Sequence, residues 1–256
     1  MFEENKEFLS GERIYVGVDF YDVKSYEDHF DRYKFAGQYL QSSFIVVDAS
    51  CGTGYGSEII SGLSKKVIGL DLSDHALAWA KAHHSKSNIE FKKADLNGHI
   101  DISSDSVDAI VSFETLEHVE KQEMMLGEFK RILKPGGILI LSSPDKDITS
   151  EARFKNRFHI HELSKNEFVG ILQKFFTIEG IYTQSKFCKQ PFYKDMIKIV
   201  ITKLDILRLR PRIARWLGLT SKVHKAFSAS QFTPIQRTTI DAKNDSFVLI
   251  AVCRKR

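Results

Sequence analysis

The chain has 256 residues, of which 43% are hydrophobic and 27% are charged, and its formal net charge is +4. This composition excludes a disordered chain, and the length suits one α/β domain with either an elaboration or a small cap. Three widely spaced cysteines exclude a disulfide framework, and no apolar run reaches the roughly 18 residues that a membrane-spanning helix needs. The acidic start of the chain also lacks the pattern of a signal peptide, so we expect a cytoplasmic protein.

From about residue 44, short apolar runs alternate with helical patterns. The expected strands cover residues 44–49, 66–72, 89–96, 107–114 and 137–144, and the expected helices cover residues 73–84 and 121–133, with a further helix beginning near residue 56. Ser73 or Asp74 is the expected N-cap of helix 73–84, and a Pro-Gly-Gly sequence should end helix 121–133. Continuous Val, Ile and Leu runs are typical of parallel strands buried on both faces. Their alternation with helices predicts βαβ units.

The later part of the chain predicts a helix over residues 164–176, a strand over 177–184 and a final strand over 246–256. The roughly 55 residues between the last two strands are basic and partly amphipathic. A loop of that length without structure is uncommon in a compact domain. We therefore expect an inserted helical subdomain there.

The sequence VVDASCGTGYGSEI, residues 46–59, joins the first strand to a helix through a glycine-rich turn that could hold a nucleotide cofactor. A triphosphate loop needs a Lys and a Ser or Thr after its last glycine, but Gly56 is followed by Ser57 and Glu58. A dinucleotide loop needs a glycine three positions after Gly54, where this chain has Ser57. Both phosphate-binding readings are therefore weak.

S-adenosylmethionine carries no phosphate, and a loop for it needs only glycines that let the backbone pass close to the ligand, here Gly52 and Gly54. Asp48, at the end of the first strand, suits a cationic, amine-bearing ligand. Asp71 ends the second strand and is placed to accept both ribose hydroxyls. Asp95 follows the third strand and is placed to accept from the adenine amine. All of these positions lie on the carboxyl edge of one sheet, where ligands of open α/β sheets bind.

The chain resembles class I S-adenosylmethionine-dependent methyltransferases over about residues 29–180. The motifs that carry the resemblance are VVDASCGTGYG, VIGLDLS, KKADL, VDAIVSFETLEHV and RILKPGGILILSSP. It implies a Rossmann-like doubly wound sheet of seven strands, mostly parallel with an antiparallel last strand, and a helical insert. One departure is Ser50, where the family more often has glycine.

The residues assigned to the cofactor, or to its product S-adenosylhomocysteine, follow from these motifs. They are Asp48, Ser50, Cys51, Gly52, Gly54, Asp71, Leu72, Ala94, Asp95, Leu96, Phe113 and Glu114. The expected organisation is an N-terminal lid over 1–43, a core over 44–185, a basic helical insert over 186–240 and the final core strand over 241–256.

Three further stretches, GERIYVG, HFDRYKFA and NRFHIHELSKNEF, resemble a bacterial subgroup that often occurs with cell-surface polysaccharide biosynthesis. In that subgroup's pattern His29, Arg32 and Tyr33 would close over the methionine end of the cofactor. The alternative is that they belong to an ordinary amphipathic helix.

His118, in FETLEHVE after the fourth strand, is the candidate base for a hydroxyl acceptor, and the alternative is a structural histidine. This position lacks the Asn/Asp-Pro-Pro-aromatic tetrapeptide that positions a planar amino group, which disfavours nucleobase amine methylation. His159 and His161 either line the acceptor mouth or form a solvent-exposed pair.

A helical turn through this segment would place Glu114, Glu117 and His118 on one face, where they could hold a divalent cation. The favoured alternative is that Glu114 contacts the cofactor and Glu117 pairs with a lysine. We therefore expect no metal, with the three-residue site as the second hypothesis.

Charge is distributed unevenly along the chain. Residues 1–33 carry nine acidic and four basic residues, whereas residues 186–226 carry eleven basic and two acidic residues. The basic segment predicts a solvated cap, a peripheral contact with the inner face of the membrane, or a pocket for an anionic acceptor. It lacks a recognised nucleic-acid module, so we do not expect RNA as a partner.

The sequence thus predicts an enzyme that methylates a small-molecule or glycan acceptor, most simply at oxygen. The alternatives are N-methylation of a sugar amine, RNA modification, and a cofactor-binding partner protein without turnover. The acceptor itself and the oligomeric state do not follow from the sequence.

Overall fold

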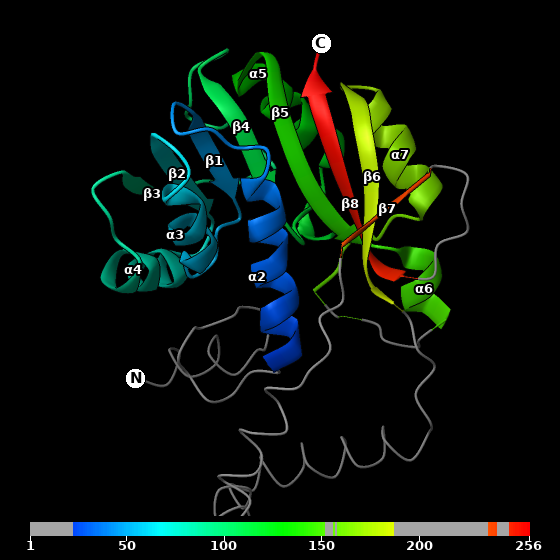
Figure 1. Ribbon diagram of the computed structural model, residues 1–256. Coiled ribbons are helices and arrows are strands. Elements are labelled where there is room, and N and C mark those ends of the chain that lie inside the picture. The colour runs from blue at the N-terminus through cyan, green and yellow to red at the C-terminus, as the bar shows by residue number, and fades with distance from the viewer. Residues whose placement is uncertain (1–22, 152–155, 157, 187–234, 240–245) are drawn as a thin grey trace, which may run out of the picture. The chain divides into compact units, whose positions relative to one another are not determined.

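The computed structural model describes residues 23–151, 156, 158–186, 235–239 and 246–256, and the described part is built around one eight-stranded sheet (Figure 1). Its strands run in the order β3-β2-β1-β4-β5-β8-β6-β7. They are β1 (Ile45–Ala49), β2 (Lys66–Asp71), β3 (Ile89–Lys93), β4 (Val107–Ser112), β5 (Leu133–Pro144), β6 (Phe176–Lys186), β7 (Gln236–Thr238) and β8 (Ser246–Lys255). Strands β1 to β5 are parallel, while β8 is antiparallel to both β5 and β6.

Helices cover both faces of the sheet. They are α2 (Val23–Gly37), α3 (Tyr55–Ser61), α4 (Asp74–His83), the 3-10 turn η1 (Leu116–His118), α5 (Gln122–Ile132), α6 (Lys146–Glu151) and α7 (Lys165–Gln173). The Ser73 side chain caps α4 by accepting from the Ala76 amide, and α7 begins with a capping box made by Ser164 and Glu167. Within the described residues, no helix combines the length and the apolar character needed to cross a membrane.

The doubly wound α/β class and the antiparallel final strand are confirmed, but the sheet has eight strands instead of seven. The additional strand is β7, which pairs with β6 through Ile181, Tyr182 and Thr183. The sequence prediction placed residues 236–238 in the helical insert, because a three-residue polar strand carries no periodic apolar signal. The rest of the predicted insert, and the lid residues 1–22, lie outside the described residues.

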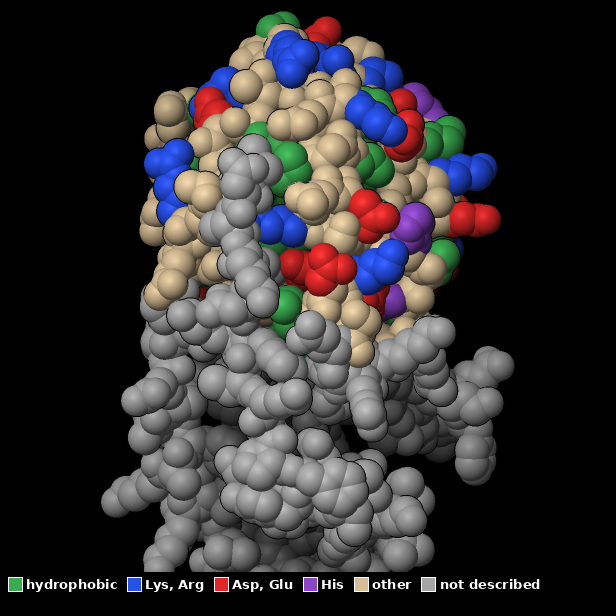
Figure 2. Space-filling view, turned by 90° about the vertical axis from the view of Figure 1, so that its right-hand side faces the viewer, with side chains coloured by type: hydrophobic (Ala, Val, Ile, Leu, Met, Phe, Trp, Pro, Cys, Tyr) green, Lys and Arg blue, Asp and Glu red, His purple; other side chains and the backbone are tan. Residues whose placement is uncertain are grey.

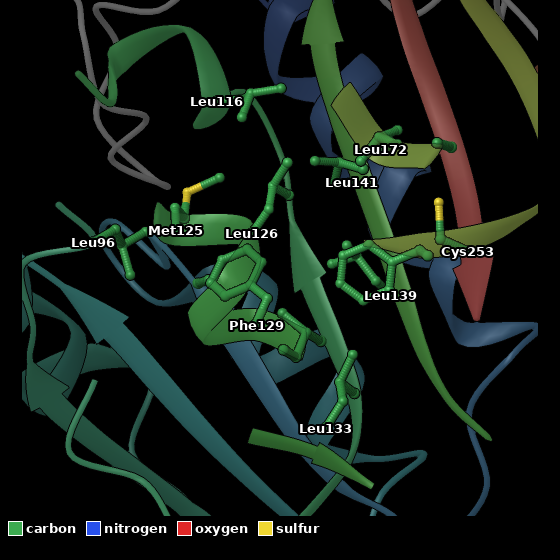
Figure 3. Packing of buried hydrophobic residues seen from close by; sticks show 14 of the residues in the cluster. Leu96, Leu116, Met125, Leu126, Phe129, Leu133, Leu139, Leu141, Leu172 and Cys253 are labelled. Carbon is green, nitrogen blue, oxygen red and sulfur yellow. The ribbon is translucent and has the colours of Figure 1, made fainter. Parts of the chain in front are cut away.

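Two buried clusters fill the space between sheet and helices. One packs α5 and α7 against one face and includes Leu126, Phe129 and Leu172 (Figure 3). The other packs α2 and α3 against the opposite face and includes Ala36 and Ile60. Successive side chains of each apolar strand point to opposite faces of the sheet and pack into one cluster or the other. Both faces are therefore buried, which explains why these strands carry so few polar residues.

From β1 the chain continues to β2 and β3, which lie on one side of β1, and from β4 it continues to β5, which lies on the other side. The strand order therefore changes direction between β1 and β4. In open α/β sheets the crevice at the carboxyl ends of such strands is where ligands bind. The glycine-rich turn after β1 and the segment after β4 both lie at this edge. The fold therefore brings the two motifs that the sequence singled out to one place.

Helix α2 is fixed to the glycine-rich turn through Asp48 at the end of β1. The Tyr33 hydroxyl donates to Asp48 Oδ1 at 3.0 Å, and the Ser57 hydroxyl donates to Asp48 Oδ2 at 2.6 Å. The Tyr33 ring also makes an edge-to-face contact with Phe113, at 5.0 Å between centroids. Neighbouring Arg32 donates to Gln184 Oε1 at 2.9 Å and so ties α2 to β6.

Asp48 is fully buried, and burial raises the pKa of its carboxyl to about 6. The hydrogen bonds from Ser57 and Tyr33 oppose this rise, and the charge of Asp71 adds to it. Asp48 is therefore an internal negative charge at neutral pH that is held by two hydroxyl donors.

The surface of the described residues carries charges of both signs. Figure 2 shows Lys and Arg side chains interspersed with Asp and Glu on the face that lies at the right of Figure 1. Paired charges of this kind include Arg254 with Glu179, and Lys174 with Glu123. The strongly basic residues 186–226 lie almost wholly outside the described part.

We expect Gly56→Ala to destabilise the protein by about 1–3 kcal/mol, as overpacking in a filled core does. A Cβ atom at Gly56 would lie 1.9 Å from Cζ of the buried Tyr33 ring. Gly170→Ala in α7 is the matched control, because a Cβ there meets nothing within 4 Å and alanine favours the helix by up to about 1 kcal/mol. Urea unfolding of both variants measures the difference, and equal stabilities would contradict the packing argument.

We expect Asp48→Asn to gain stability relative to the wild type as the pH rises. The wild-type pKa is raised from 3.8 to about 6 on folding, so the folded state binds the proton more tightly and loses stability between these two values. The difference between variant and wild type should move by about 2–3 kcal/mol in favour of the variant between pH 4 and pH 7.5. Denaturant unfolding at both pH values tests this, and parallel pH profiles would refute a buried charge at Asp48.

Candidate functional site

Every second residue from 50 to 54, in the turn after β1, has a left-handed backbone conformation. Ser50, Gly52 and Gly54 have φ angles of 60°, 54° and 88°. A Cβ on Gly54 would also lie 2.7 Å from Cβ of Ala80, whereas a Cβ on Gly52 meets nothing within 4 Å. Gly54 is therefore required for packing on α4, and Gly52 presents open backbone at the edge of the sheet. This is the backbone clearance that the sequence predicted for the cofactor.

Ser50 adopts the left-handed conformation that glycine enters without steric cost. For a residue with a Cβ this conformation costs roughly 1–2 kcal/mol. The structure thus gives a physical reason why glycine suits this position, and serine there costs the turn some stability.

Asp71 ends β2 and holds the turn from the adjacent strand. Its Oδ2 accepts from the Gly52 amide at 2.9 Å, and its Oδ1 accepts from the Ser73 amide at 2.9 Å. The carboxylate therefore connects the glycine-rich turn to the N-terminus of α4. Next to it, the Leu72 side chain is 57% exposed, which leaves a large apolar group at the edge where a planar ring could cover it.

Asp95 lies just beyond β3 and is exposed, with Oδ1 accepting from the Asn97 amide at 2.9 Å. The amide of its neighbour Ala94 donates to the Asp71 carbonyl at 3.0 Å. Leu96, in contrast, is a member of the main hydrophobic cluster. Asp71 and Asp95 thus lie at the carboxyl ends of neighbouring strands, and Leu96 supports them from the core.

Three predicted cofactor residues lie beneath the turn. Asp48 is enclosed by Tyr33 and Ser57, the Cys51 side chain packs in a small cluster with α4, and Phe113 belongs to the cluster under α2. Burial raises the pKa of the Cys51 thiol, which keeps it protonated. The side chains of these three residues shape and support the turn, while their contact with a cofactor stays a prediction.

After β4, two acidic side chains are held by consecutive serines of β5. The Ser142 hydroxyl donates to Glu114 Oε1 at 2.7 Å and accepts from the Glu114 amide at 3.1 Å. The Ser143 hydroxyl donates to Glu117 Oε2 at 3.1 Å. Because β4 and β5 are parallel neighbours, the end of β5 fixes both acids at the edge beside the glycine-rich turn.

Glu117 is fully buried, and its Oε1 accepts no hydrogen bond from any described residue. Burial raises the pKa of this carboxyl well above its usual value, and the charge of Glu114 raises it further. The hydrogen bond from Ser143 and the positive charge of Arg32 act in the opposite direction. The pKa of Glu117 therefore depends on the charges around it, and its Oε1 could accept a hydrogen bond or contact a cation.

His118 is oriented by a backbone carbonyl from a distant segment. Its Nδ1 lies 3.0 Å from the Phe158 oxygen, which can only accept, so Nδ1 donates this hydrogen bond. His118 Nε2 is 3.9 Å from Glu117 Oε1. The His159 ring lies edge-to-face against His118, at 4.9 Å between centroids, and His159 Nδ1 is hydrogen-bonded to Glu162.

The structure changes the set of residues that could hold a metal. Glu114 has a φ of 49° and precedes the 3-10 turn of Leu116–His118, so it does not share a helical face with Glu117 and His118. His159 takes its place, and the ligand atoms of Glu117, His118 and His159 lie within 4.8 Å of one another. The helical-spacing argument was wrong on this point because the segment is a single tight turn.

Sequence reasoning considered His159 and His161 either as residues that line the acceptor mouth or as a solvent-exposed pair, and it missed Glu162, Ser142 and Ser143. The structure pairs His159 with Glu162, whereas His161 contributes its backbone amide to the Glu117 carbonyl at 3.2 Å. The three-residue spacing of His159 and Glu162 was a usable signal for a pair. The serines carried no signal in the sequence, because each contacts an acid 26 or 28 residues away.

Known proteins resemble this chain in sequence over its central part. Residues 47–141, from β1 into β5, match the family model described as methyltransferase domain. A probable S-adenosylmethionine-dependent methyltransferase of Mycolicibacterium smegmatis is 32% identical over 130 residues, which cover 50% of this chain and 49% of that protein. The mitochondrial ubiquinone biosynthesis O-methyltransferase of Mus musculus is 31% identical over 116 residues, which cover 43% and 31%. The chain therefore spans about half the length, or less, of these curated relatives.

Solved structures share the fold at low sequence identity. The YcgJ protein of Bacillus subtilis is 16% identical with a TM-score of 0.61, over 89% of this chain and 99% of that one. The N-methyltransferase NodS of Bradyrhizobium japonicum, in complex with S-adenosyl-L-homocysteine, is 14% identical with a TM-score of 0.55, over 91% and 86%. Residues 47–141 therefore match a methyltransferase domain, and the described residues share the fold of these solved structures.

Proposed function

We propose that the protein transfers a methyl group from S-adenosylmethionine to a hydroxyl oxygen of a small-molecule or glycan acceptor. The observation that carries the proposal is one sheet edge with two differently built halves. One half is the glycine-rich turn with Asp71 and Asp95. The other half is the group of buried Glu117 with the half-buried His118 and His159. A donor and an acceptor placed at this edge would be close enough for in-line transfer.

The residues of the first half fit S-adenosylmethionine. Gly52 gives open backbone for the amino-acid end, Asp71 suits the ribose hydroxyls, and exposed Leu72 offers an apolar surface for the adenine. When bound, this cofactor supplies a methyl group that is already activated by its sulfonium charge. Positioning then provides much of the catalysis, and the fixed geometry of the turn serves that purpose.

The second half suits an acceptor that must lose a proton. A hydroxyl group has a high pKa and benefits from a base or a metal ion, whereas a neutral amine needs little beyond alignment. The Phe158 carbonyl orients His118, the candidate base that would take the hydroxyl proton as the new carbon–oxygen bond forms. The polar group around it, in which Glu117 is buried and both histidines are half-buried, supports a hydroxyl acceptor over an amine.

The names of the similar proteins support methyl transfer but divide on the acceptor atom. The ubiquinone biosynthesis proteins are named O-methyltransferases, and NodS is named an N-methyltransferase. A glycan acceptor remains our proposal from the three stretches that resemble the polysaccharide-associated subgroup. A peripheral membrane or anionic-acceptor contact through residues 186–226 is likewise a proposal from charge alone.

We expect Asp71→Ala to weaken binding of S-adenosylmethionine and S-adenosylhomocysteine by about 10–100-fold. The variant loses the ribose acceptor and also the hydrogen bonds that hold Gly52 and Ser73. Calorimetry measures the affinity, and Asp74→Ala is the control, since the exposed Asp74 contacts Lys93 on the surface. Failure of the wild type to bind either compound would refute the proposed cofactor.

We expect His118→Gln to lower turnover by at least about 100-fold while the affinity for S-adenosylhomocysteine stays within a factor of about three. Turnover is followed as S-adenosylhomocysteine release with a panel of sugar, nucleotide-sugar and phenolic hydroxyl acceptors, together with their amino analogues. His99→Gln is the control, because His99 is a surface histidine that pairs with Glu128. Turnover with amino analogues alone would replace oxygen with nitrogen as the acceptor atom.

A further inference from the structure

The described part of the connection between α6 and α7 is fixed against the η1 turn. The amides of Ile160 and His161 both donate to the Glu117 carbonyl, at 2.8 and 3.2 Å. In the opposite direction, His118 Nδ1 donates to the Phe158 carbonyl at 3.0 Å. The η1 turn therefore holds the backbone of this loop in place beside His118.

His159 is the residue of this loop whose ring contacts the candidate base. The two rings lie edge-to-face, with 4.9 Å between the centroids of His159 and His118. The His159 side chain is 15% exposed, so part of it can be reached from solvent. His159 therefore borders the place where His118 would take a proton from the methyl acceptor.

Two neighbours from the same loop fix the tautomer of His159. Its Nδ1 contacts Glu162 Oε1, and a carboxylate only accepts, so Nδ1 carries the proton. Asn156 Oδ1 accepts from the Phe158 amide at 3.1 Å, which leaves the NH₂ group of Asn156 facing His159 Nε2 at 2.9 Å. An NH₂ group only donates. Nε2 is therefore the acceptor nitrogen of a neutral ring.

Glu162 is fixed in turn from α6. Its Oε2 accepts from the Thr149 hydroxyl, and its side chain is 17% exposed. A carboxylate behind an imidazole determines which nitrogen is protonated and which way the ring faces. The Glu162 contact thus directs Nε2 of His159 toward the side of the loop where Asn156 lies.

The present partner of His159 Nε2 is a side chain that a ligand can replace. Asn156 is exposed, so its NH₂ group can turn to water when another donor takes its place. A hydroxyl group donates over a similar distance and would leave Nε2 equally satisfied. The exchange therefore costs little free energy, and the NH₂ group of Asn156 marks where a ligand donor would lie.

We propose that His159 binds a hydroxyl group of the methyl acceptor next to the hydroxyl that is methylated, and that Glu162 is the positioning residue for this contact. The proposal rests on the proposed function, in which His118 remains the base. Because the two rings touch, the two hydroxyl groups belong on adjacent carbon atoms, as in a sugar ring. Because Nε2 only accepts, an ether or a carboxylate oxygen cannot replace the second hydroxyl.

The test compares acceptors that differ by one hydroxyl group. The full chain is assayed by release of S-adenosylhomocysteine with methyl pyranosides, with catechol, and with their counterparts that lack one hydroxyl. For the wild type, loss of the second hydroxyl should raise KM by about 3–10-fold, a modest change because Asn156 takes Nε2 back. His159→Phe keeps a ring against His118, and its KM should be the same for both members of a pair.

Variants of the two neighbours separate recognition from mere support of the loop. Asn156→Asp keeps the acceptor for the Phe158 amide but places a carboxylate at Nε2, so His159 becomes a donor and KM should rise by about 10-fold with kcat little changed. A purely structural histidine would tolerate this change, since its ring stays hydrogen-bonded. Glu162→Leu should also raise KM by about 10-fold, whereas Glu162→Gln, which still accepts from Nδ1, should restore it.

His99→Phe is the control, because His99 is a surface histidine paired with Glu128, and S-adenosylhomocysteine binding by each variant confirms that it is folded. An equal effect of hydroxyl removal in the wild type and His159→Phe would overturn the proposal. Turnover confined to acceptors with a single hydroxyl would also overturn it and leave the proposed function standing. Absence of turnover with every hydroxyl acceptor would refute the proposed function and this inference together.

Discussion

The conformation of the glycine-rich turn depends on the buried carboxylate of Asp48. It sits at the end of β1 with no exposure, and its two oxygens receive the Tyr33 and Ser57 hydroxyls. Ser57 belongs to the helix that follows the glycine-rich turn, and Tyr33 belongs to α2, so one charge joins three elements. Burying it costs free energy, as its pKa of about 6 shows, and the two short contacts offset part of that cost.

This arrangement explains features of the turn that look unrelated in the sequence. Gly56 must lack a Cβ because the Tyr33 ring lies against it, and Gly54 must lack one because α4 and Phe91 approach. Asp71 then secures Gly52 from the neighbouring strand. The turn is thus fixed from beneath, from the side and from α2, which leaves its outer backbone in one conformation before any ligand arrives. Such preorganisation reduces the cost of ordering on binding.

Much of the fold followed from the sequence because it rests on local signals. Continuous apolar strands and the Ser73 cap each report on a few neighbouring residues, and the structure has these strands and the cap, although β5 begins at Leu133 instead of residue 137 and β3 ends at Lys93 instead of residue 96. The failures involve distant partners. β7 pairs with the edge that β6 offers, and Glu114 is hydrogen-bonded to Ser142, 28 residues later. No periodic pattern encodes such a contact.

The two halves of the site also differ in where their residues come from. Residues 47–141 contain the glycine-rich turn, Asp71, Asp95 and the η1 turn, and these match a methyltransferase domain. The groups that hold Glu117 and the residues around it lie outside that range. They are Ser143, the His159–Glu162 pair, and Gln184, which accepts from Arg32 near Glu117. Similarity within 47–141 therefore covers the glycine-rich turn and the η1 turn, whereas the contacts that hold Glu117 and His159 depend on residues outside this range.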